Sequence, residues 1–93
     1  MIRSFKHKGL RQFAQTGDGA KLSVPNHDRV RQILLALDAA VSPQMMDIPG
    51  LRFHQLKGKE KGTYSVRVTG NWRMTFAFDG EDAVNVNLED YHG

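Results

Sequence analysis

The stretch that decides the fold is residues 64–78, Tyr-Ser-Val-Arg-Val-Thr-Gly-Asn-Trp-Arg-Met-Thr-Phe-Ala-Phe. Apolar and polar side chains alternate on both sides of Gly70-Asn71, and a period of two is typical of strands that bury one face. Glycine and asparagine both tolerate positive φ, so they favour a tight turn between antiparallel strands. The stretch therefore predicts a β-hairpin.

The length of the turn decides which side chains face each other. A two-residue turn would pair Val68 with Arg73 and would put an apolar residue and a charge on one face. We therefore expect a three-residue loop, residues 69–71, which pairs Val68 with Trp72. In this register Arg67 faces Arg73 on the open side of the sheet, at a cost of about 0.2–1 kcal/mol. An anion between the two arginines, or nearby carboxylates, would offset that repulsion.

Two further strands are expected outside the hairpin. Downstream, Val84, Val86 and Leu88 alternate with polar residues, which predicts a strand with these three side chains in the core. Upstream, a short first strand is suggested by Ile2, Ser4 and Phe5.

Two helices are expected before the hairpin. Residues 7–16 carry apolar side chains at helical spacing, and Gly17 is a natural stop. A linker, residues 17–25, leads to a second helix that Asn26 can cap. Its apolar stripe comprises Val30, Ile33, Leu34, Leu37 and Val41. Two helices followed by an antiparallel meander indicate an α+β fold, with the helices packed on a mainly antiparallel sheet.

Length and composition limit the class of protein. A chain of 93 residues is expected to form one domain, 1–93, around one hydrophobic core. Its 40% hydrophobic and 25% charged residues are ordinary for a globular protein. The chain has no cysteine, which excludes disulfides and thiolate sites. No apolar run is long enough for a signal peptide or a membrane span, so we expect a soluble cytoplasmic protein.

The net charge of +3 is mild, but the charges are unevenly distributed. Residues 52–73 contain one acidic residue, Glu60, and the basic residues Arg52, Lys57, Lys59, Lys61, Arg67 and Arg73. Residues 79–90 reverse the sign with Asp79, Glu81, Asp82, Glu89 and Asp90. A basic patch of this kind predicts a contact surface for a polyanion. The solvated rim of a hairpin would have a similar composition.

The groups that RNA cleavage requires occur in this basic segment and at residues 89–92. Cleavage without a metal needs a base for the 2′-OH, an acid for the 5′-oxygen, and cations for the charged phosphorane. Histidine can serve as acid or base because its unperturbed pKa is nearest neutrality. The catalytic candidates are His54, Lys57, Arg73, Asp90, Tyr91 and His92. The candidates for binding RNA or its phosphates are Lys57, Lys59, Lys61, Arg67, Asn71 and Arg73.

Each candidate also has a purely structural explanation. His92 could be a frayed end, His54 could bond within a loop, and Lys59 and Lys61 could only solubilise a hairpin tip. Residue types alone therefore leave a nuclease and a non-catalytic RNA-binding module both open. The chain has no HExxH pattern and no glycine-rich nucleotide loop, so we expect neither a metal nor a cofactor.

An ordered set of motifs over nearly the whole chain resembles HigB toxins of the RelE/ParE superfamily. The motifs are Ile2-Arg3-Ser4-Phe5, Leu56-Lys57-Gly58, Gly62-Thr63-Tyr64-Ser65-Val66-Arg67-Val68, Asn71-Trp72-Arg73-Met74-Thr75-Phe76 and Glu89-Asp90-Tyr91-His92. The resemblance implies a compact RelE-like α+β RNase. The resemblance also implies that the protein enters the A site of the 30S subunit, beside 16S rRNA, and cuts mRNA by 2′-OH attack.

The resemblance also implies partners and roles for single residues. The partners are the ribosome, mRNA and a HigA-like helix-turn-helix antitoxin, which links the toxin indirectly to operator DNA. Where positions match the family, the implied catalytic or phosphate-holding set is His54, Lys57, Arg73, Asp90, Tyr91 and His92. Gly93 departs from the family, in which the histidine is usually terminal. A ParE-like toxin that inhibits DNA gyrase without catalysis shares the scaffold and is the alternative.

Overall fold

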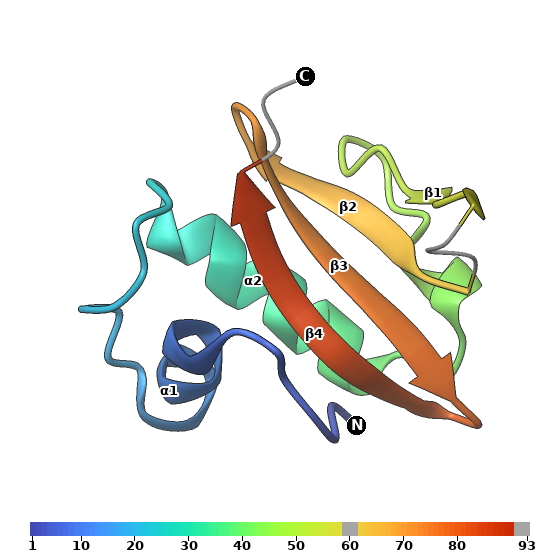
Figure 1. Ribbon diagram of the computed structural model, residues 1–93, viewed down its shortest axis with the longest axis horizontal. Coiled ribbons are helices and arrows are strands. Elements are labelled where there is room, and N and C mark those ends of the chain that lie inside the picture. Colours follow the sequence, from blue (N-terminus) through green and yellow to red (C-terminus); the bar gives the residue numbers. More distant parts are fainter. Residues whose placement is uncertain (59–61, 91–93) are drawn as a thin grey trace.

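The computed structural model describes residues 1–58 and 62–90, in which two helices precede a four-stranded antiparallel sheet (Figure 1). The helices are α1 (Lys8–Thr16) and α2 (His27–Ala39), followed by a short 3-10 helix, η1 (Pro43–Met46). The strands lie side by side in the order β1 (His54–Gln55), β2 (Tyr64–Thr69), β3 (Trp72–Asp79) and β4 (Asp82–Asp90). This arrangement confirms the predicted α+β class.

The first helix begins and ends at the residues that its sequence indicates. Nδ1 of His7 accepts a hydrogen bond from the Leu10 amide at 3.0 Å and caps the N-terminus. Gly17 has φ 79°, and its amide donates to the Phe13 carbonyl at 2.9 Å. Glycine adopts this left-handed conformation at no steric cost, so it stops the helix cleanly. The prediction of a helix over residues 7–16 is confirmed to within one residue.

The second helix is capped by Asn26, whose Oδ1 accepts from the Arg29 amide at 3.2 Å. Its buried stripe comprises Val30, Ile33, Leu34 and Leu37, which are the first four of the five predicted residues. Val41 is 50% exposed, so its place in the stripe is wrong. The helix ends earlier because Ala40 has extended backbone, and Ser42, which precedes a proline, is extended as well.

The hairpin between β2 and β3 has a two-residue turn, so the predicted three-residue loop and the pairing of Val68 with Trp72 are wrong. Thr69 pairs with Trp72, and the register then shifts so that Arg67 pairs with Arg73. The extra residue of this bulge is Val68, which stays 1% exposed in the core. A bulge adds one residue to one strand and so restores the inward and outward alternation. The predicted juxtaposition of Arg67 and Arg73 is confirmed.

A side chain from α2 holds this bulge. Nε of Arg29 donates to the Val68 carbonyl, and Nη2 donates to the Gly50 carbonyl at 3.1 Å. Arg29 therefore joins the helix both to the hairpin and to the turn that leads into β1.

We expect Arg29→Met to lower the free energy of unfolding by about 1–3 kcal/mol, because a buried acceptor loses its donor. Arg31→Met on the same helix is the matched control. The ion pair of Arg31 with Asp28 is exposed, and such pairs contribute about 0–1 kcal/mol. Urea denaturation of both variants measures the difference. Equal losses of unfolding free energy in the two variants would show that the hydrogen bond from Arg29 to Val68 stabilises the fold no more than an exposed ion pair does.

Strand β4 changes the face that it buries near Asn85. The pairing of β3 with β4 shifts there, and Asn85 has φ 56°. Ala83 is therefore fully buried on one side of the shift, while Val86 and Leu88 are buried on the other. The predictions for Val86 and Leu88 are confirmed. Val84 is only partly buried, so its prediction as a core residue is wrong.

The first residues of the chain run parallel to β4. Ile2 bridges to Ala83 and Phe5 bridges to Val86, so the short first strand predicted here is present only as two isolated bridges. Backbone hydrogen bonds of 2.8–3.1 Å link the two segments.

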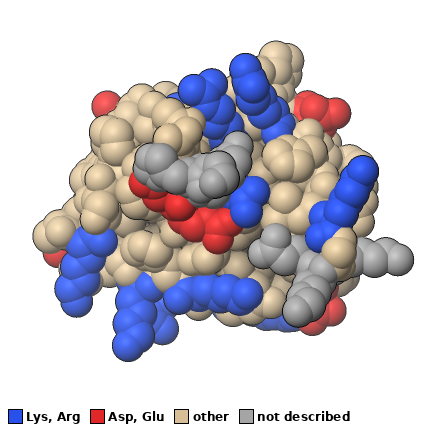
Figure 2. All heavy atoms as spheres, turned by 45° about the horizontal axis from the view of Figure 1, so that its top comes forward, with Lys and Arg blue, Asp and Glu red and all other residues tan. Residues whose placement is uncertain are grey.

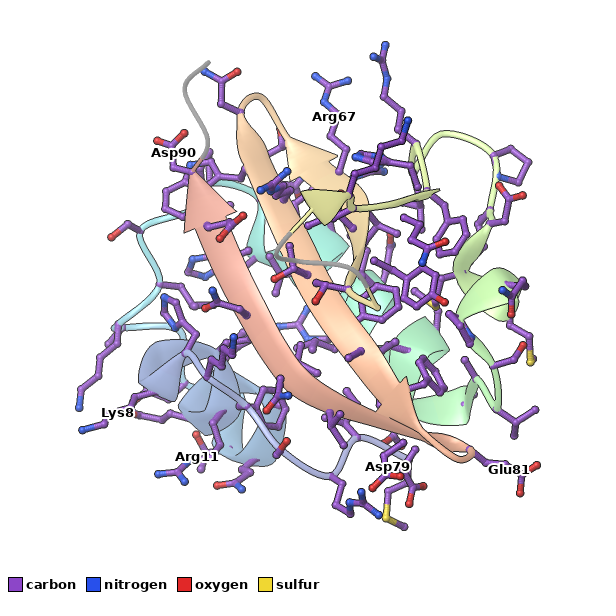
Figure 3. The ribbon with its side chains drawn as sticks, turned by 45° about the vertical axis from the view of Figure 1, so that its right-hand side comes forward. Lys8, Arg11, Arg67, Asp79, Glu81 and Asp90 are labelled. Atoms are coloured by element: carbon purple, nitrogen blue, oxygen red, sulfur yellow. The ribbon has the colours of Figure 1, made fainter. Side chains whose placement is uncertain are left out.

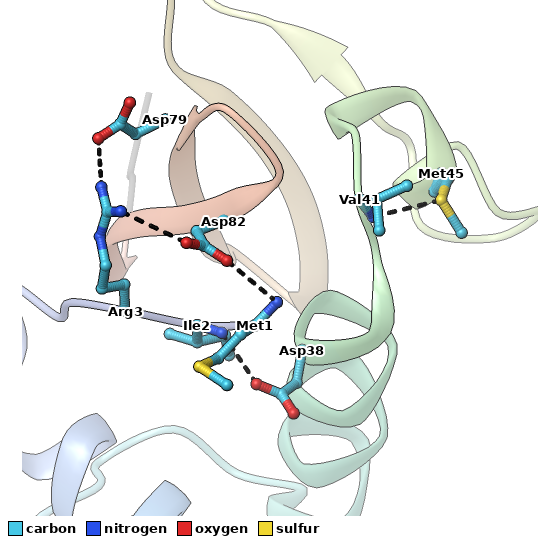
Figure 4. Close-up of polar contacts among 8 residues, drawn as sticks. All are labelled: Met1, Ile2, Arg3, Asp38, Val41, Met45, Asp79 and Asp82. Carbon is cyan, nitrogen blue, oxygen red and sulfur yellow. Dashed lines mark hydrogen bonds and ion pairs between the residues drawn. The ribbon is translucent and has the colours of Figure 1, made fainter.

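Polar contacts fasten this segment to both layers (Figure 4). Arg3 pairs with Asp79 and, at 3.3 Å, with Asp82. The Ile2 amide donates to Oδ1 of Asp38 on α2 at 2.8 Å. Part of the acidic segment is therefore neutralised inside the fold, at the end of the sheet opposite to Arg67 and Asp90 (Figure 3).

The core lies between the sheet and the helices, and α2 runs behind the strands in Figure 1. Trp72 packs partly buried against it, as its alternation predicts. The fully or nearly fully buried side chains of the core include Leu10, Phe13, Val30, Ile33, Leu34, Leu37, Met46, Val66, Val68, Met74, Phe76, Ala83, Val86 and Leu88. The opposite face of the sheet carries the polar residues of the alternation.

Candidate functional site

Two hollows of the described structure are similar in volume but differ in the chemistry of their lining. One, of about 460 Å³, lies among the N-terminal segment, α1 and α2, and its lining is mostly apolar. Its charged members already have partners, since Arg31 pairs with Asp28 and Asp38 accepts from the Ile2 amide. The other, of about 380 Å³, is polar and cationic. The second hollow is therefore the candidate site.

The cationic hollow is lined by residues of the segment around β1, of β2 and of β3: Arg52, Phe53, His54, Ser65, Arg67 and Arg73. Figure 2 shows Lys and Arg side chains spread around a smaller central group of Asp and Glu side chains on one face of the molecule. An imidazole and three guanidinium groups thus come together from segments that are far apart in the sequence.

The register of the sheet explains this convergence. One row of paired residues crosses all four strands and contains His54, Ser65, Thr75 and Asn87. The neighbouring row contains Arg67, Arg73 and Glu89. Residues two apart on a strand share a face, so the two rows lie next to each other on the face away from the helices, where Ser65 and Thr75 are buried and Arg67 is exposed. The histidine and the arginines are neighbours because of this pairing.

Arg73 and Glu89 form an ion pair across β3 and β4. Nε and Nη2 of Arg73 lie 2.6 and 2.5 Å from Oε1 of Glu89. The Arg73 side chain is 17% exposed, so the pair is partly shielded from water. A carboxylate therefore neutralises Arg73. Nearby carboxylates are one of the two means that the sequence predicts for offsetting the repulsion between Arg67 and Arg73.

The other two arginines of the hollow have no carboxylate partner among the residues that the structure describes. Nε of Arg67 donates to the Gly70 carbonyl at 3.2 Å, which leaves the rest of its fork toward solvent. Within residues 1–58 and 62–90, neither Arg52 nor Arg67 forms an ion pair with a carboxylate. The hollow thus has an excess of positive charge.

His54 is held in a defined orientation at the edge of the sheet. Its Nδ1 lies 3.0 Å from the Arg52 carbonyl, and its Nε2 lies 3.5 Å from the Ser65 hydroxyl. A carbonyl only accepts, so the proton of the neutral ring belongs on Nδ1. Nε2 is then the nitrogen that carries the lone pair, and the Ser65 hydroxyl can donate to it.

Other predicted residues do not line this hollow. Lys57 lines a separate, shallow hollow of about 280 Å³, together with Gln55, Leu56 and Gly58. Asn71 is exposed in the turn between β2 and β3.

Asp90 ends β4 and pairs with Trp72. Figure 3 places Asp90 and Arg67 at the same end of the sheet. Four further candidates, Lys59, Lys61, Tyr91 and His92, lie outside the described residues.

Three lining residues, Arg52, Phe53 and Ser65, were not among the predicted site residues. Ser65 lies two positions before Arg67 on the same face of β2, so strand parity could have indicated it, although Ser65 itself is buried. Arg52 precedes the two-residue strand β1, which the sequence did not indicate. The only signal for Arg52 in the sequence was its place in the basic segment, residues 52–73.

Neither a metal cluster nor a membrane helix is found in the part of the chain that the structure describes. No three His, Asp or Glu side chains there gather so that they could hold a metal ion. No helix there has the length and apolarity needed to span a bilayer.

The family of the chain follows from comparison with known proteins. A family model described as the RelE-like toxin of the type II toxin–antitoxin system HigB matches residues 3–92. The chain belongs to this HigB-like toxin family. Membership in a type II system implies an antitoxin as partner.

Two curated relatives span almost the same length. The chain is 39% identical to "Endoribonuclease HigB" of Proteus vulgaris over 92 residues, which cover 99% of this chain and 100% of the relative. It is 34% identical to "Toxin HigB-1" of Vibrio cholerae serotype O1 over 92 residues, with 96% of each chain covered.

Proposed function

We propose that this protein is a ribosome-dependent endoribonuclease that cleaves mRNA in the A site and so arrests translation. The observation that carries the proposal is the cationic hollow, which His54 lines together with Arg67 and Arg73. The name of the Proteus relative, an endoribonuclease, supports the same chemistry. The mostly apolar hollow between the helices offers no comparable set of groups.

The reaction requires one proton to be removed and another to be supplied. A base takes the proton of the 2′-OH, the 2′-oxygen attacks phosphorus, and the bond to the 5′-oxygen breaks as an acid protonates that oxygen. The products are a 2′,3′-cyclic phosphate and a 5′-hydroxyl. His92 or Asp90 acts as the base, and His54 donates the second proton or orients the substrate.

Cations and an aromatic ring complete the proposed site. Arg73 and Lys57 stabilise the negative charge that grows on the phosphorane, because fixed charges in a partly shielded site act without reorganisation. Lys59, Lys61, Arg67 and Asn71 contact the RNA, and Tyr91 stacks on a base. One domain of RelE-like topology carries all of these residues.

The partners follow from this reading. The protein works in the cytoplasm on mRNA held by the 30S subunit, beside 16S rRNA. A HigA-like helix-turn-helix antitoxin neutralises it and links it to operator DNA.

The test is to map transcript ends in a translating extract, with and without ribosomes, for the wild type and His92→Ala. We expect ribosome-dependent cuts with 2′,3′-cyclic phosphate ends for the wild type, and cutting reduced by at least about 100-fold for the variant, because its acid–base group is lost. Cutting of free RNA at the same rate would contradict ribosome dependence. Intact message combined with DNA damage in cells would favour the ParE-like gyrase inhibitor instead.

A further inference from the structure

We propose that Arg52 binds a second phosphate of the RNA strand, next to the one that is cleaved. Arg52 is assigned no role by the sequence motifs, yet it lines the cationic hollow beside His54, Arg67 and Arg73. The inference rests on the proposed nuclease function and adds a subsite to it. The ligand is a phosphodiester of single-stranded RNA.

The backbone of Arg52 is the first observation. Among the described residues, three that are not glycine have positive φ: Asn26, Arg52 and Asn85. Asparagine is enriched in the left-handed region, whereas arginine pays a steric cost there. At φ 51° a glycine would be the least strained choice for position 52. A strained residue that survives in a binding hollow points to a use for its side chain.

The neighbours of Arg52 explain why the strain persists. Leu51 is 7% exposed, and its carbonyl accepts from the Arg67 amide at 2.7 Å. Phe53 stacks on Tyr64 with ring centroids 5.6 Å apart. Both flanking residues are therefore fixed, and position 52 must turn left-handed between them. The turn presents the Arg52 carbonyl to His54 and leaves the side chain at the hollow.

The charges of the hollow are the second observation. Glu89 neutralises Arg73, whereas no carboxylate in the described part of the chain pairs with Arg52 or Arg67. Two uncompensated guanidinium groups beside one hollow repel each other unless an anion lies between them. A guanidinium fork matches the oxygens of a phosphate well. We assign this second phosphate to Arg52 and Arg67, and the scissile phosphate to Arg73.

The experiment measures binding of a short 2′-O-methyl RNA, which has no free 2′-OH and so is not cut. Arg52→Gly and Arg52→Ala both remove the guanidinium, but only the glycine variant also relieves the strain. We expect each to weaken binding about tenfold, as for a lost charge-assisted contact. The slope of log affinity against log salt should fall in magnitude by about 0.7, the value for one phosphate contact on a single strand. Message cutting in extract should fall in parallel.

Arg11→Ala is the matched control, since it removes one positive charge from α1 on the far side of the molecule (Figure 3). Its affinity and salt slope should match those of the wild type. Both Arg52 variants should melt cooperatively, with the melting temperature of Arg52→Gly at least that of Arg52→Ala, so that binding lost in these folded variants is not lost folding.

Unchanged binding in both Arg52 variants, or an equal loss in Arg11→Ala, overturns the subsite. A wild type that binds through Arg52 but cuts no message refutes the nuclease and leaves the subsite standing.

Discussion

Replacing Arg73 by glutamine should slow message cleavage by about 10²–10³-fold, the cost of removing one group that stabilises charge in a transition state. Arg73 is 17% exposed and sits between Arg67 and Glu89 in the row that borders the hollow. In this shielded position its charge acts on the phosphorane more strongly than a surface charge would. Single-turnover cutting of a defined message in translating extract measures the effect.

A purely structural role for Arg73 predicts a different pattern. If it served only to pair with Glu89, then Glu89→Gln would damage the protein as much as Arg73→Gln, since each breaks the same ion pair. We expect Glu89→Gln to keep at least about one third of the wild-type cleavage rate. We expect Glu89→Gln and Arg73→Gln both to melt cooperatively. A rate for Arg73→Gln within threefold of the wild type would remove Arg73 from the mechanism.

The second large effect concerns stability, where Phe76→Ala should lower the free energy of unfolding by about 3–5 kcal/mol. Phe76 is fully buried, and its ring lies 6.1 Å from the ring of Tyr64 and 6.1 Å from that of Phe78. The loss includes both the transferred ring and the cavity left behind. Because small domains are stable by about 5–15 kcal/mol, this variant should be close to unfolding. Urea denaturation measures it.

Phe76→Leu provides the comparison if the alanine variant does not fold. A leucine keeps much of the volume, so we expect a loss of about 1.5 kcal/mol or less. The slope of the urea transition should stay unchanged in the leucine variant, because both forms expose the same surface on unfolding. A loss below about 1 kcal/mol for Phe76→Ala would contradict the position of this ring in the core.

Local signals were sufficient for most of the secondary structure. The α1 stop at Gly17 and the α2 cap at Asn26 each act within four residues, so the sequence states them directly. The alternation of residues 64–78 likewise predicts two strands and the facing of Arg67 and Arg73. Features that depend only on residues close in the sequence could therefore be predicted from the sequence.

The two bulges were not readable in this way. An extra residue at Val68 keeps the inward and outward alternation of both strands, so the pattern fits either turn length. In β4, only the tolerance of Asn85 for positive φ hinted that Ala83 would replace Val84 in the core. Packing between layers decides both cases, and periodicity contains no information about it.

The candidate site was predicted in part for the same reason. His54, Arg67 and Arg73 were expected to belong to it, and the hollow brings these three together. Lys57 lies in a neighbouring hollow, and Arg52 was missed. The segment around residue 52 is positioned by a long-range bond, from the Arg67 amide to the Leu51 carbonyl at 2.7 Å. No local pattern reveals a contact across 16 positions of sequence.

Strand β1 is only two residues long, which affects how easily one wall of the hollow can open. These two residues pair with β2, through His54 with Ser65 and Gln55 with Tyr64, and no strand of the described residues lies beside the outer edge of β1. An edge strand of this length opens at a smaller cost in free energy than the central β2–β3 hairpin, even though its side chains are held in place in the closed form. Among the four strands, amide hydrogen exchange should therefore be fastest in β1, on the side of the hollow that carries the imidazole.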